Sequence, residues 1–206
     1  MPRRPDLPPL HREDLAPDPF AQFAAWFEQA AAEVPLPEAM TLATVDREGM
    51  PDARMVLLKG AGPDGFHFFT NYESAKGRQL EGTGRGAIVV YWRELDRQVR
   101  ARGSVERLPS AESDAYFASR SRDSQIGAWA SPQSRPLISR DELDREVEEV
   151  AARFGDGPVE RPPHWGGYLL MPDTVEFWQG QVGRLHDRFR YSQVTGGGWM
   201  VERLGP

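Results

Sequence analysis

The chain has 206 residues, 39% of them hydrophobic and 27% charged, and a formal net charge of −6 at pH 7. This composition predicts a soluble globular protein with one core of ordinary size and excludes the collagen-like and disordered classes. The negative charge argues against general nucleic-acid binding, and the absence of cysteine excludes disulfides, thiolate metal ligands and cysteine nucleophiles.

The sequence offers no sign of a membrane or export segment. No apolar run approaches about 18 residues, and the basic residues Arg3 and Arg4 are not followed by the apolar stretch of a secretory signal. We therefore expect a cytoplasmic protein. The six carboxylates between Asp141 and Glu149 predict the solvated face of a helix, and no metal site is expected.

The N-terminal part of the chain predicts an arm followed by a helix. Residues 1–17 are rich in proline and charge, which predicts a flexible arm, and residues 18–206 are expected to form a single domain. Asp18 followed by Pro19 has the form of a helix start, and the helix is expected to run to about Glu33. Its core-facing stripe is predicted from helical spacing to be Phe20, Phe23, Ala24, Phe27 and Ala31.

From Met40 the pattern changes to short strands joined by tight turns. Strands are predicted at 40–46, 52–59, 66–71, 86–92, 98–107, 165–171, 174–179, 188–194 and 199–204. Helices are predicted at 74–80, at 110–119 and from Ser139 to Gly155. The last is expected to bury a stripe of Leu143, Val147, Val150, Ala151 and Phe154. The segment 120–129 is left unassigned. The pattern indicates a mainly antiparallel β-barrel with attached helices.

The stretch 175–191 places chemically capable side chains in a glycine-punctuated turn between two strands. Arg184 and His186 are two residues apart, so in an extended segment they would point to one face, and Arg188 would continue it. Two guanidinium groups and an imidazole on one side suit a phosphorylated or otherwise anionic ligand. The alternative is a solvated hairpin with an incidental histidine.

Further basic and polar residues occur in the predicted strands and their adjoining turns. No dinucleotide fingerprint, P-loop, zinc-protease motif or serine nucleophile elbow is present. Arginine and lysine assisted by hydroxyl and amide groups are typical of phosphate sites. Taken singly, each position is better explained as surface, but their joint order is informative: Arg54, Lys59, Thr70, Lys76, Gln98, Arg120, Ser124, Gln133, Ser134, Arg184, His186 and Arg188.

The chain closely resembles the pyridoxamine 5′-phosphate oxidase family, whose members are flavin enzymes that make pyridoxal 5′-phosphate. The resemblance covers nearly everything from Met40 to the C-terminus, and the ordered set of motifs is highly specific. The matching segments are Arg54-Met55-Val56-Leu57-Leu58-Lys59, Phe69-Thr70-Asn71, Arg97-Gln98-Val99, Tyr116-Phe117, 120–129, Ser131-Pro132-Gln133-Ser134, Trp165-Gly166-Gly167, Phe177-Trp178-Gln179-Gly180 and 184–188.

The resemblance implies an FMN-binding split barrel that works as a homodimer, with both active sites built across the subunit interface. It implies that FMN is held by Arg54, Met55, Val56, Leu57, Leu58, Lys59, Phe69, Thr70, Lys76, Gln98, Gln133, Ser134, Trp178 and Arg188. It implies a substrate-phosphate site of Lys59, Tyr116, Arg120 and Ser124, with Arg184 and His186 as catalytic residues that face the pyridine ring. The implied reaction oxidises pyridoxamine or pyridoxine 5′-phosphate with O2 and releases H2O2, plus ammonia from the amine.

Three positions depart from the family pattern. Ala75 stands where the family commonly has arginine, which removes one expected contact to the FMN phosphate and predicts weaker FMN retention. Phe69 stands where tyrosine is frequent, and Gly183 where asparagine often precedes Arg184. Glycine is harder to order than other residues, so Gly183 is expected to loosen the turn.

Three alternatives to the oxidase remain open. The first is a split-barrel flavin reductase, which Tyr116, Arg120, Ser124 and the pair Arg184 and His186 disfavour because together they match a pyridoxal-phosphate site. The second is a non-catalytic protein that binds FMN or pyridoxal 5′-phosphate, for which Ala75 would be a sign of decay. The third is a structural β-domain whose charges are simply solvated.

Overall fold

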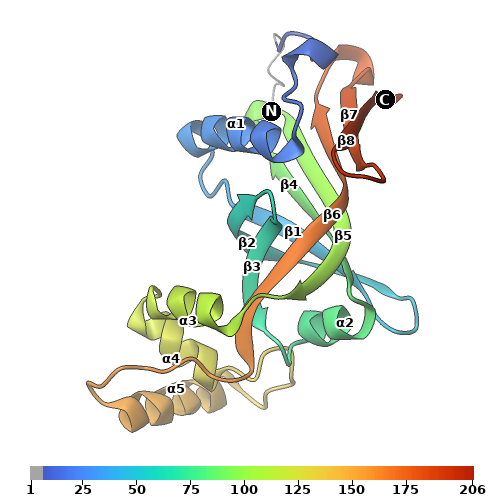
Figure 1. The fold of residues 1–206 in the computed structure, drawn as a ribbon. Helices are drawn as coiled ribbons and strands as arrows, with labels where there is room; N and C mark the ends of the chain where they lie inside the picture. The colour runs from blue at the N-terminus through green and yellow to red at the C-terminus, as the bar shows by residue number, and fades with distance from the viewer. Residues whose placement is uncertain (1–6) are drawn as a thin grey trace.

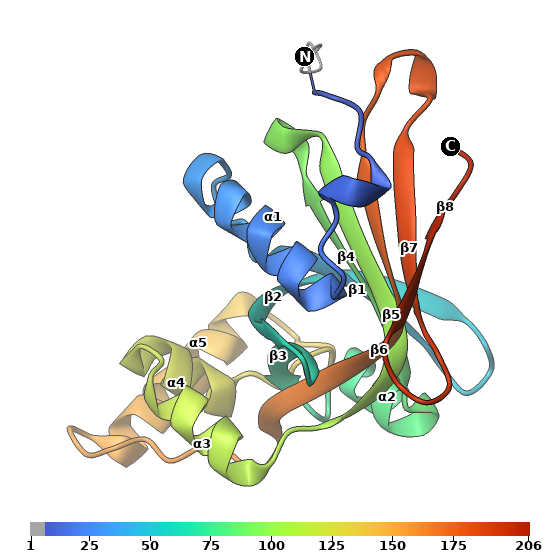
Figure 2. The ribbon, with the colours of Figure 1, turned by 45° about the horizontal axis from the view of Figure 1, so that its top comes forward.

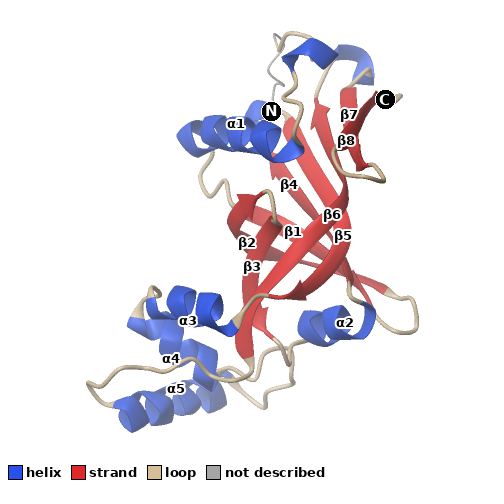
Figure 3. Cartoon of the chain, in the orientation of Figure 1, coloured by secondary structure: helices blue, strands red, loops and turns tan. Residues whose placement is uncertain are grey.

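The computed structural model describes residues 7–206 and has a β-barrel at its centre with helices at both ends (Figures 1 and 3). The strands are β1 (Ala39–Val45), β2 (Pro51–Gly62), β3 (Gly65–Asn71), β4 (Arg85–Trp92), β5 (Arg97–Arg107), β6 (Trp165–Gln179), β7 (Asp187–Gln193) and β8 (Trp199–Arg203). The α-helices are α1 (Pro19–Glu33), α2 (Ala75–Thr83), α3 (Ser110–Ala118), α4 (Arg122–Ala130) and α5 (Arg140–Phe154). Short 3-10 turns occur at η1 (Arg12–Asp14), η2 (Arg93–Leu95) and η3 (Val182–Arg184).

The sheet closes on itself and then splits. Its strand order is β3-β2-β1-β4-β5-β6-β7-β8, and an additional pairing of β3 with β6 closes the first six strands into a barrel. The long strand β6 pairs with β3 through its first half, from Trp165 to Leu170, and with β7 through its second half, from Thr174 to Gln179. All these pairings are antiparallel, so the expected antiparallel split barrel is confirmed.

Helix α1 packs its aromatic side chains onto the barrel core. Asp18 caps the helix by accepting a hydrogen bond from the Ala21 amide, as its sequence predicts. Phe23 lies edge-on to Phe66 at 5.2 Å between ring centroids, and Trp26 lies edge-on to Phe177 at the same distance. The predicted stripe is wrong at two positions, Ala24 and Ala31, which are exposed. Trp26 and Ala30 are buried instead, and the Trp26 ring packs on Phe177 in the core.

Helices α4 and α5 differ most from the sequence prediction. The unassigned segment 120–129 contains α4, which begins where Ser121 accepts a hydrogen bond from the Ser124 amide. Phe154 of α5 packs on Trp129 of α4 at 5.7 Å between ring centroids. The expected burial of Val147 and Ala151 is wrong: both are exposed, because α5 packs mainly against α4 and these two side chains lie on its uncovered face.

The structure also bears on the predictions for β6 and for the N-terminal arm. The predicted strands at 165–171 and 174–179 are one continuous strand, since β6 passes through Pro172 at a bulge opposite Arg102 and Gly103. Residues 7–17 lie along the ends of β6, β7 and β8 (Figure 2), with Leu10 and Leu15 buried. The rest of the predicted arm lies outside the described residues. No helix within residues 7–206 is long and apolar enough to cross a membrane.

Candidate active site

The first cluster of predicted site residues lies beside the start of α2. The Lys76 ammonium donates a hydrogen bond to the Gln133 side-chain oxygen at 2.9 Å, and the Thr70 hydroxyl donates to the same oxygen at 3.1 Å. Ser74 caps the helix by accepting from the Gly77 amide. Burial, and then repulsion by Arg54, lower the pKa of Lys76 from its ordinary value. We call Arg54, Thr70, Lys76 and Gln133 the α2 cluster.

Arg54 itself is fixed by a set of neighbours that sequence reasoning missed. Its guanidinium donates to the Thr44 hydroxyl at 2.5 Å and to the Gln79 side-chain oxygen at 3.0 Å, and it pairs with Asp52 at 2.6 Å. Thr44 lies on the strand paired with β2, two residues from where Leu42 faces Arg54. That cross-strand relation could have been found only once the β1–β2 register was known.

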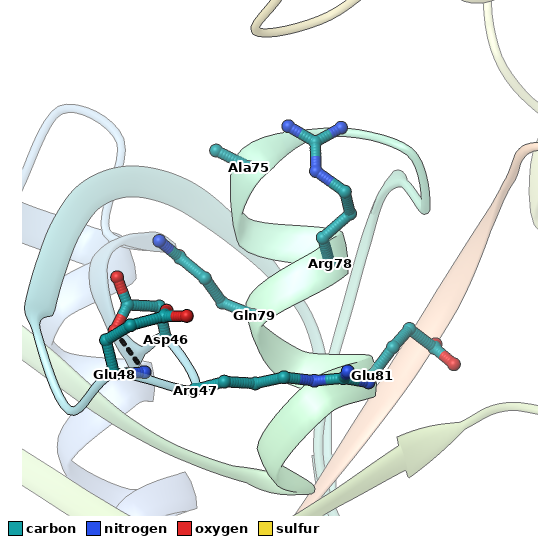
Figure 4. Close-up of a pocket in the computed structure, with 7 residues that line it drawn as sticks. All are labelled: Asp46, Arg47, Glu48, Ala75, Arg78, Gln79 and Glu81. Atoms are coloured by element: carbon teal, nitrogen blue, oxygen red, sulfur yellow. Dashed lines mark hydrogen bonds between the residues drawn. The ribbon is translucent and has the colours of Figure 1, made fainter.

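A cavity of about 500 Å³ lies between α2 and the β1–β2 turn, and Gln79, which bonds to Arg54, lines it (Figure 4). Ala75 and Gln79 of α2 line it from one side, and the β1–β2 turn residues Asp46, Arg47 and Glu48 line it from the other. The expected arginine is replaced at this wall by the methyl group of Ala75. The space that a longer side chain would enter is therefore open.

The second cluster combines stacked aromatic rings with a half-buried arginine. Phe69 stacks on Tyr116 at 4.0 Å and on Trp165 at 5.5 Å between ring centroids. The Arg120 guanidinium lies over the Trp165 ring at 4.7 Å, and its Nη1 atom is buried with no hydrogen-bond partner among residues 7–206. Burial lowers the pKa of Arg120. Ser124, in the first turn of α4, is held by the Ser121 hydroxyl at 2.8 Å. We call Tyr116, Arg120 and Ser124 the α3–α4 cluster.

The third cluster lies at the other end of the barrel, around the turn between β6 and β7. Gln98, Trp178 and Arg188 are direct cross-strand neighbours on β5, β6 and β7. The His186 ring packs on the Trp178 ring at 4.6 Å, and its Nδ1 atom accepts a hydrogen bond from the Gln181 amide at 3.1 Å. Because a peptide N–H is always a donor, neutral His186 carries its proton on Nε2. We call Gln98, Trp178, Arg184, His186 and Arg188 the turn cluster.

The expectation that Arg184 lies in an extended segment is wrong. Gly183 and Arg184 both have left-handed backbone conformations, with φ of 69° and 63°, and Val182–Arg184 form a 3-10 turn. The alternation that would place Arg184 and His186 on one face therefore does not apply here. Gly183 suits this conformation because it has no Cβ, whereas Arg184 adopts it at a cost in strain.

Arg188 is held by Glu176, a residue that sequence reasoning missed. The Arg188 Nε atom donates to Glu176 at 2.9 Å, and Arg100 donates to the other oxygen of the same carboxylate at 2.6 Å. Glu176 is buried and lies two residues before Trp178, hence on the same face of β6. An acidic residue opposite arginines in paired strands is the signal that could have identified it.

The predicted FMN-lining residues of β2 alternate between two faces. Leu58 is buried and Val56 half-buried, whereas Met55, Leu57 and Lys59 are exposed. Lys59 and Arg54 thus lie on opposite faces of the strand, and Lys59 lies at a β-bulge between Leu58 and Gly60. Ser134 follows Gln133 with a left-handed backbone, φ 70°.

One chain does not bring the three clusters together. Trp165, beside the α3–α4 cluster, and Trp178, in the turn cluster, lie near opposite ends of the same strand, and Figure 1 shows α3 and α4 far from the β6–β7 turn. At about 3.3 Å per residue, the path along β6 between these two rings is roughly 40 Å. The α3–α4 cluster and the turn cluster of one chain therefore lie toward opposite ends of β6.

Comparison with known proteins identifies the family. Residues 27–154 match the family described as pyridoxamine 5′-phosphate oxidase, and residues 165–206 match the pyridoxine 5′-phosphate oxidase C-terminal dimerisation region. The chain belongs to the pyridoxamine 5′-phosphate oxidase family. It is 52% identical over 198 residues to the pyridoxine/pyridoxamine 5′-phosphate oxidase of Cupriavidus necator and 54% identical over 198 residues to that of Bordetella petrii. Each alignment covers 96% of this chain and 93% of the relative.

Two solved structures share the fold of this chain. The chain is similar to PhzG from Burkholderia lata, solved in complex with tetrahydrophenazine-1-carboxylic acid, with a TM-score of 0.88 and 32% identity over 96% of this chain and 98% of that one. A pyridoxamine 5′-phosphate oxidase-related, FMN-binding protein from Nostoc punctiforme has a TM-score of 0.74 at 18% identity, over 93% of this chain and 100% of that one, and shares the fold.

The clusters fit the phosphate-bearing ligands expected of this family. Lys76 and Arg120 are partly buried cations, and neither forms a direct ion pair within residues 7–206, although Asp52 attracts Lys76 electrostatically. A cation that loses hydration without gaining a counter-ion is destabilised, so each would gain from a bound anion. The orphaned Nη1 of Arg120, next to stacked rings, suits a molecule that carries both a ring and a phosphate. No group of His, Asp and Glu in the described chain could hold a metal ion.

Proposed function

We propose that this protein is an FMN-dependent oxidase that converts pyridoxamine 5′-phosphate and pyridoxine 5′-phosphate to pyridoxal 5′-phosphate. O2 is the electron acceptor, H2O2 is released, and the amine substrate also yields ammonia. The reaction would serve vitamin B6 synthesis and salvage. The observation that carries the proposal is the buried, unpartnered Nη1 of Arg120 beside the Tyr116 and Trp165 rings, in a chain 52% identical to curated oxidases of these substrates.

The α2 cluster would hold the FMN phosphate. Arg54 and Lys76 supply the positive charge, and Thr70 supplies a hydroxyl donor. Gln133 already joins Thr70 and Lys76 through one oxygen, so the three side chains approach a common point. The remaining residues proposed to contact FMN are Met55, Val56, Leu57, Leu58, Lys59, Phe69, Gln98, Ser134, Trp178 and Arg188. Bound FMN would supply the redox chemistry, accepting a hydride from the substrate C4′ and returning two electrons to O2.

The α3–α4 cluster and Lys59 would bind the substrate phosphate, and the turn cluster would act on its ring. Tyr116 and Ser124 offer hydroxyl groups, and the Arg120 Nη1 atom offers a desolvated donor. His186, with its proton on Nε2, can donate a hydrogen bond to the ring oxygen of the substrate. Arg184 would bind the same edge of the ring and orient C4′. Neither residue needs to remove a proton from carbon, since C4′ loses a hydride.

We further propose that the active enzyme is a homodimer with each site built from two chains. The supporting argument is the roughly 40 Å path along β6 between the α3–α4 cluster and the turn cluster. In a two-fold dimer, the turn cluster of one chain can lie over the α2 and α3–α4 clusters of its partner. Residues 165–206, which match a dimerisation region, include the turn cluster's Trp178, Arg184, His186 and Arg188.

The test is to add pyridoxamine 5′-phosphate to FMN-loaded protein without oxygen and follow the flavin absorbance. Bleaching that recovers in air supports the oxidase. Bleaching only with a nicotinamide donor would instead indicate a reductase, and no bleaching with either would indicate a carrier. Arg184→Ala should lower turnover far more than FMN content, and equal losses of both would show that Arg184 has only a structural role.

A further inference from the structure

The turn that carries Arg184 and His186 is exposed at its tip and fastened at its base. Val182 is 75% exposed and Leu185 71% exposed, and the two left-handed residues between them have little packing to hold them. At the base, the Gly180 amide donates to the Asp96 carbonyl at 2.8 Å, and the Gln181 amide donates to His186. Within one chain, the orientation of the tip therefore depends on what fixes the residues at its base.

Asp187 is the buried anchor of that base. It directly follows His186, is 5% exposed, and accepts hydrogen bonds from three different parts of the chain. The Leu10 amide donates to it at 2.9 Å, the Gln181 side-chain amide at 3.0 Å, and Arg203 of β8 at 2.6 Å. One carboxylate thus joins the N-terminal segment, the turn and the last strand.

The N-terminal segment is fixed to the same point through its backbone. The Pro8 carbonyl accepts from the side chains of Gln179 at 2.9 Å and Gln181 at 3.3 Å, and the Leu10 carbonyl accepts from Arg203 at 2.5 Å. Figure 2 shows this segment running beside the ends of β7 and β8. Residues 8–10 therefore lie against the base of the turn as an added layer of main chain.

Gln181 connects this anchor to the chemistry. Its side chain bonds to Asp187 and to the Pro8 carbonyl, while its own backbone amide bonds to Nδ1 of His186. If the hydrogen bond from the Gln181 side chain to Asp187 or to the Pro8 carbonyl is lost, Gln181 can rotate. The hydrogen bond from its backbone amide, which selects the His186 tautomer, is then weakened. An Asp187–Arg203 ion pair serving stability alone would have no such link to His186.

We propose that Asp187, Gln181 and the backbone of residues 8–10 form a clamp that positions Arg184 and His186 for the reaction. Asp187 is a positioning residue, and the N-terminal segment is part of the active-site scaffold. The inference rests on the proposed function, in which Arg184 and His186 contact the substrate.

The test compares Asp187→Asn with Asp173→Asn in the FMN-loaded full chain. Asp173 is an exposed carboxylate on β6, paired with Arg85 at 2.7 Å, so its variant is a matched control. We expect Asp187→Asn to lower kcat by about ten- to a hundredfold and raise KM for pyridoxamine 5′-phosphate, as for a misplaced catalytic group, with the FMN Kd unchanged. Asp173→Asn should change none of these.

A second readout does not depend on activity. The ¹⁵N chemical shifts of the His186 ring report which nitrogen carries the proton, and the clamp predicts a single Nε2–H tautomer in the parent and a mixture in Asp187→Asn. Gln181→Met keeps the backbone amide but removes the side-chain hydrogen bonds, so it should shift the tautomer in the same direction. It is the variant to use if Asp187→Asn does not fold. An unchanged tautomer in both variants would overturn the clamp, as would equal losses of kcat and FMN affinity. A changed tautomer in a chain without oxidase activity would support the clamp and refute the proposed function.

Discussion

The substitution Ala75→Arg should restore a phosphate contact that this chain lacks. Ala75 is the first residue of α2, next to Lys76, and it lines the cavity of about 500 Å³ between α2 and the β1–β2 turn. A charge-assisted hydrogen bond contributes about 1.5–3 kcal/mol, which corresponds to roughly ten- to a hundredfold in affinity. Asp46 and Glu48 line the same cavity and compete for the new guanidinium. We therefore expect the lower end, a decrease in FMN Kd of about tenfold.

The assay is titration of the apoprotein with FMN, followed by the quenching of flavin fluorescence. Ala75→Gln is the control, because it adds a polar side chain, shorter than arginine, without the charge, and it should leave the Kd within about twofold of the parent. An unchanged Kd in Ala75→Arg would refute the argument that the missing arginine weakens FMN binding. An equal gain in Ala75→Gln would show that filling the cavity, rather than charge, is responsible.

Two further predictions concern stability. Gly180→Ala should lower the free energy of unfolding by about 1–3 kcal/mol in urea titrations, because the new Cβ would lie 1.9 Å from the Asp96 carboxylate. The control Gly127→Ala in α4, which meets nothing within 4 Å, should raise it by about 0.5–1 kcal/mol. Lys76 has a lowered pKa in the folded apoprotein, so the stability of the parent relative to Lys76→Met should rise as the pH approaches 10.5, because the folded lysine loses its proton before the unfolded one. A flat difference across that range in paired unfolding curves would contradict this explanation.

The sequence predicted the barrel well because strand alternation and turn residues are local signals. The first and last residues of β1, β3, β4 and β5 each fall within one residue of the predicted bounds, and the helix cap at Asp18 forms as expected. The failures concern tertiary context. Helical spacing identified an apolar stripe on α5, but spacing does not say whether another element covers it, and Val147 is left exposed. The two halves predicted for β6 are one strand because a bulge carries Pro172 through the sheet.

In the candidate site, too, the residue types could be predicted from the sequence, whereas their partners depend on tertiary structure. The order of Arg54, Lys76 and Arg120 along the chain led to the prediction of phosphate binding. The partners that fix two of them come from other parts of the chain: Thr44 and Gln79 bind Arg54, and Gln133 binds Lys76. None of these pairs is close in sequence. These contacts depend on the strand register and on how the helices pack, and neither can be predicted from a single sequence.

The proposed division of the site between two chains rests on the length of one strand. β6 closes the barrel with its first half and extends to β7 with its second, so its two ends carry Trp165 and Trp178 to opposite ends of the molecule. The length that separates the clusters within one chain also projects the turn beyond the barrel, where a second chain can receive it. Folding and assembly are thereby coupled: any change that loosens β6 at its bulge should weaken the dimer and the proposed FMN site together.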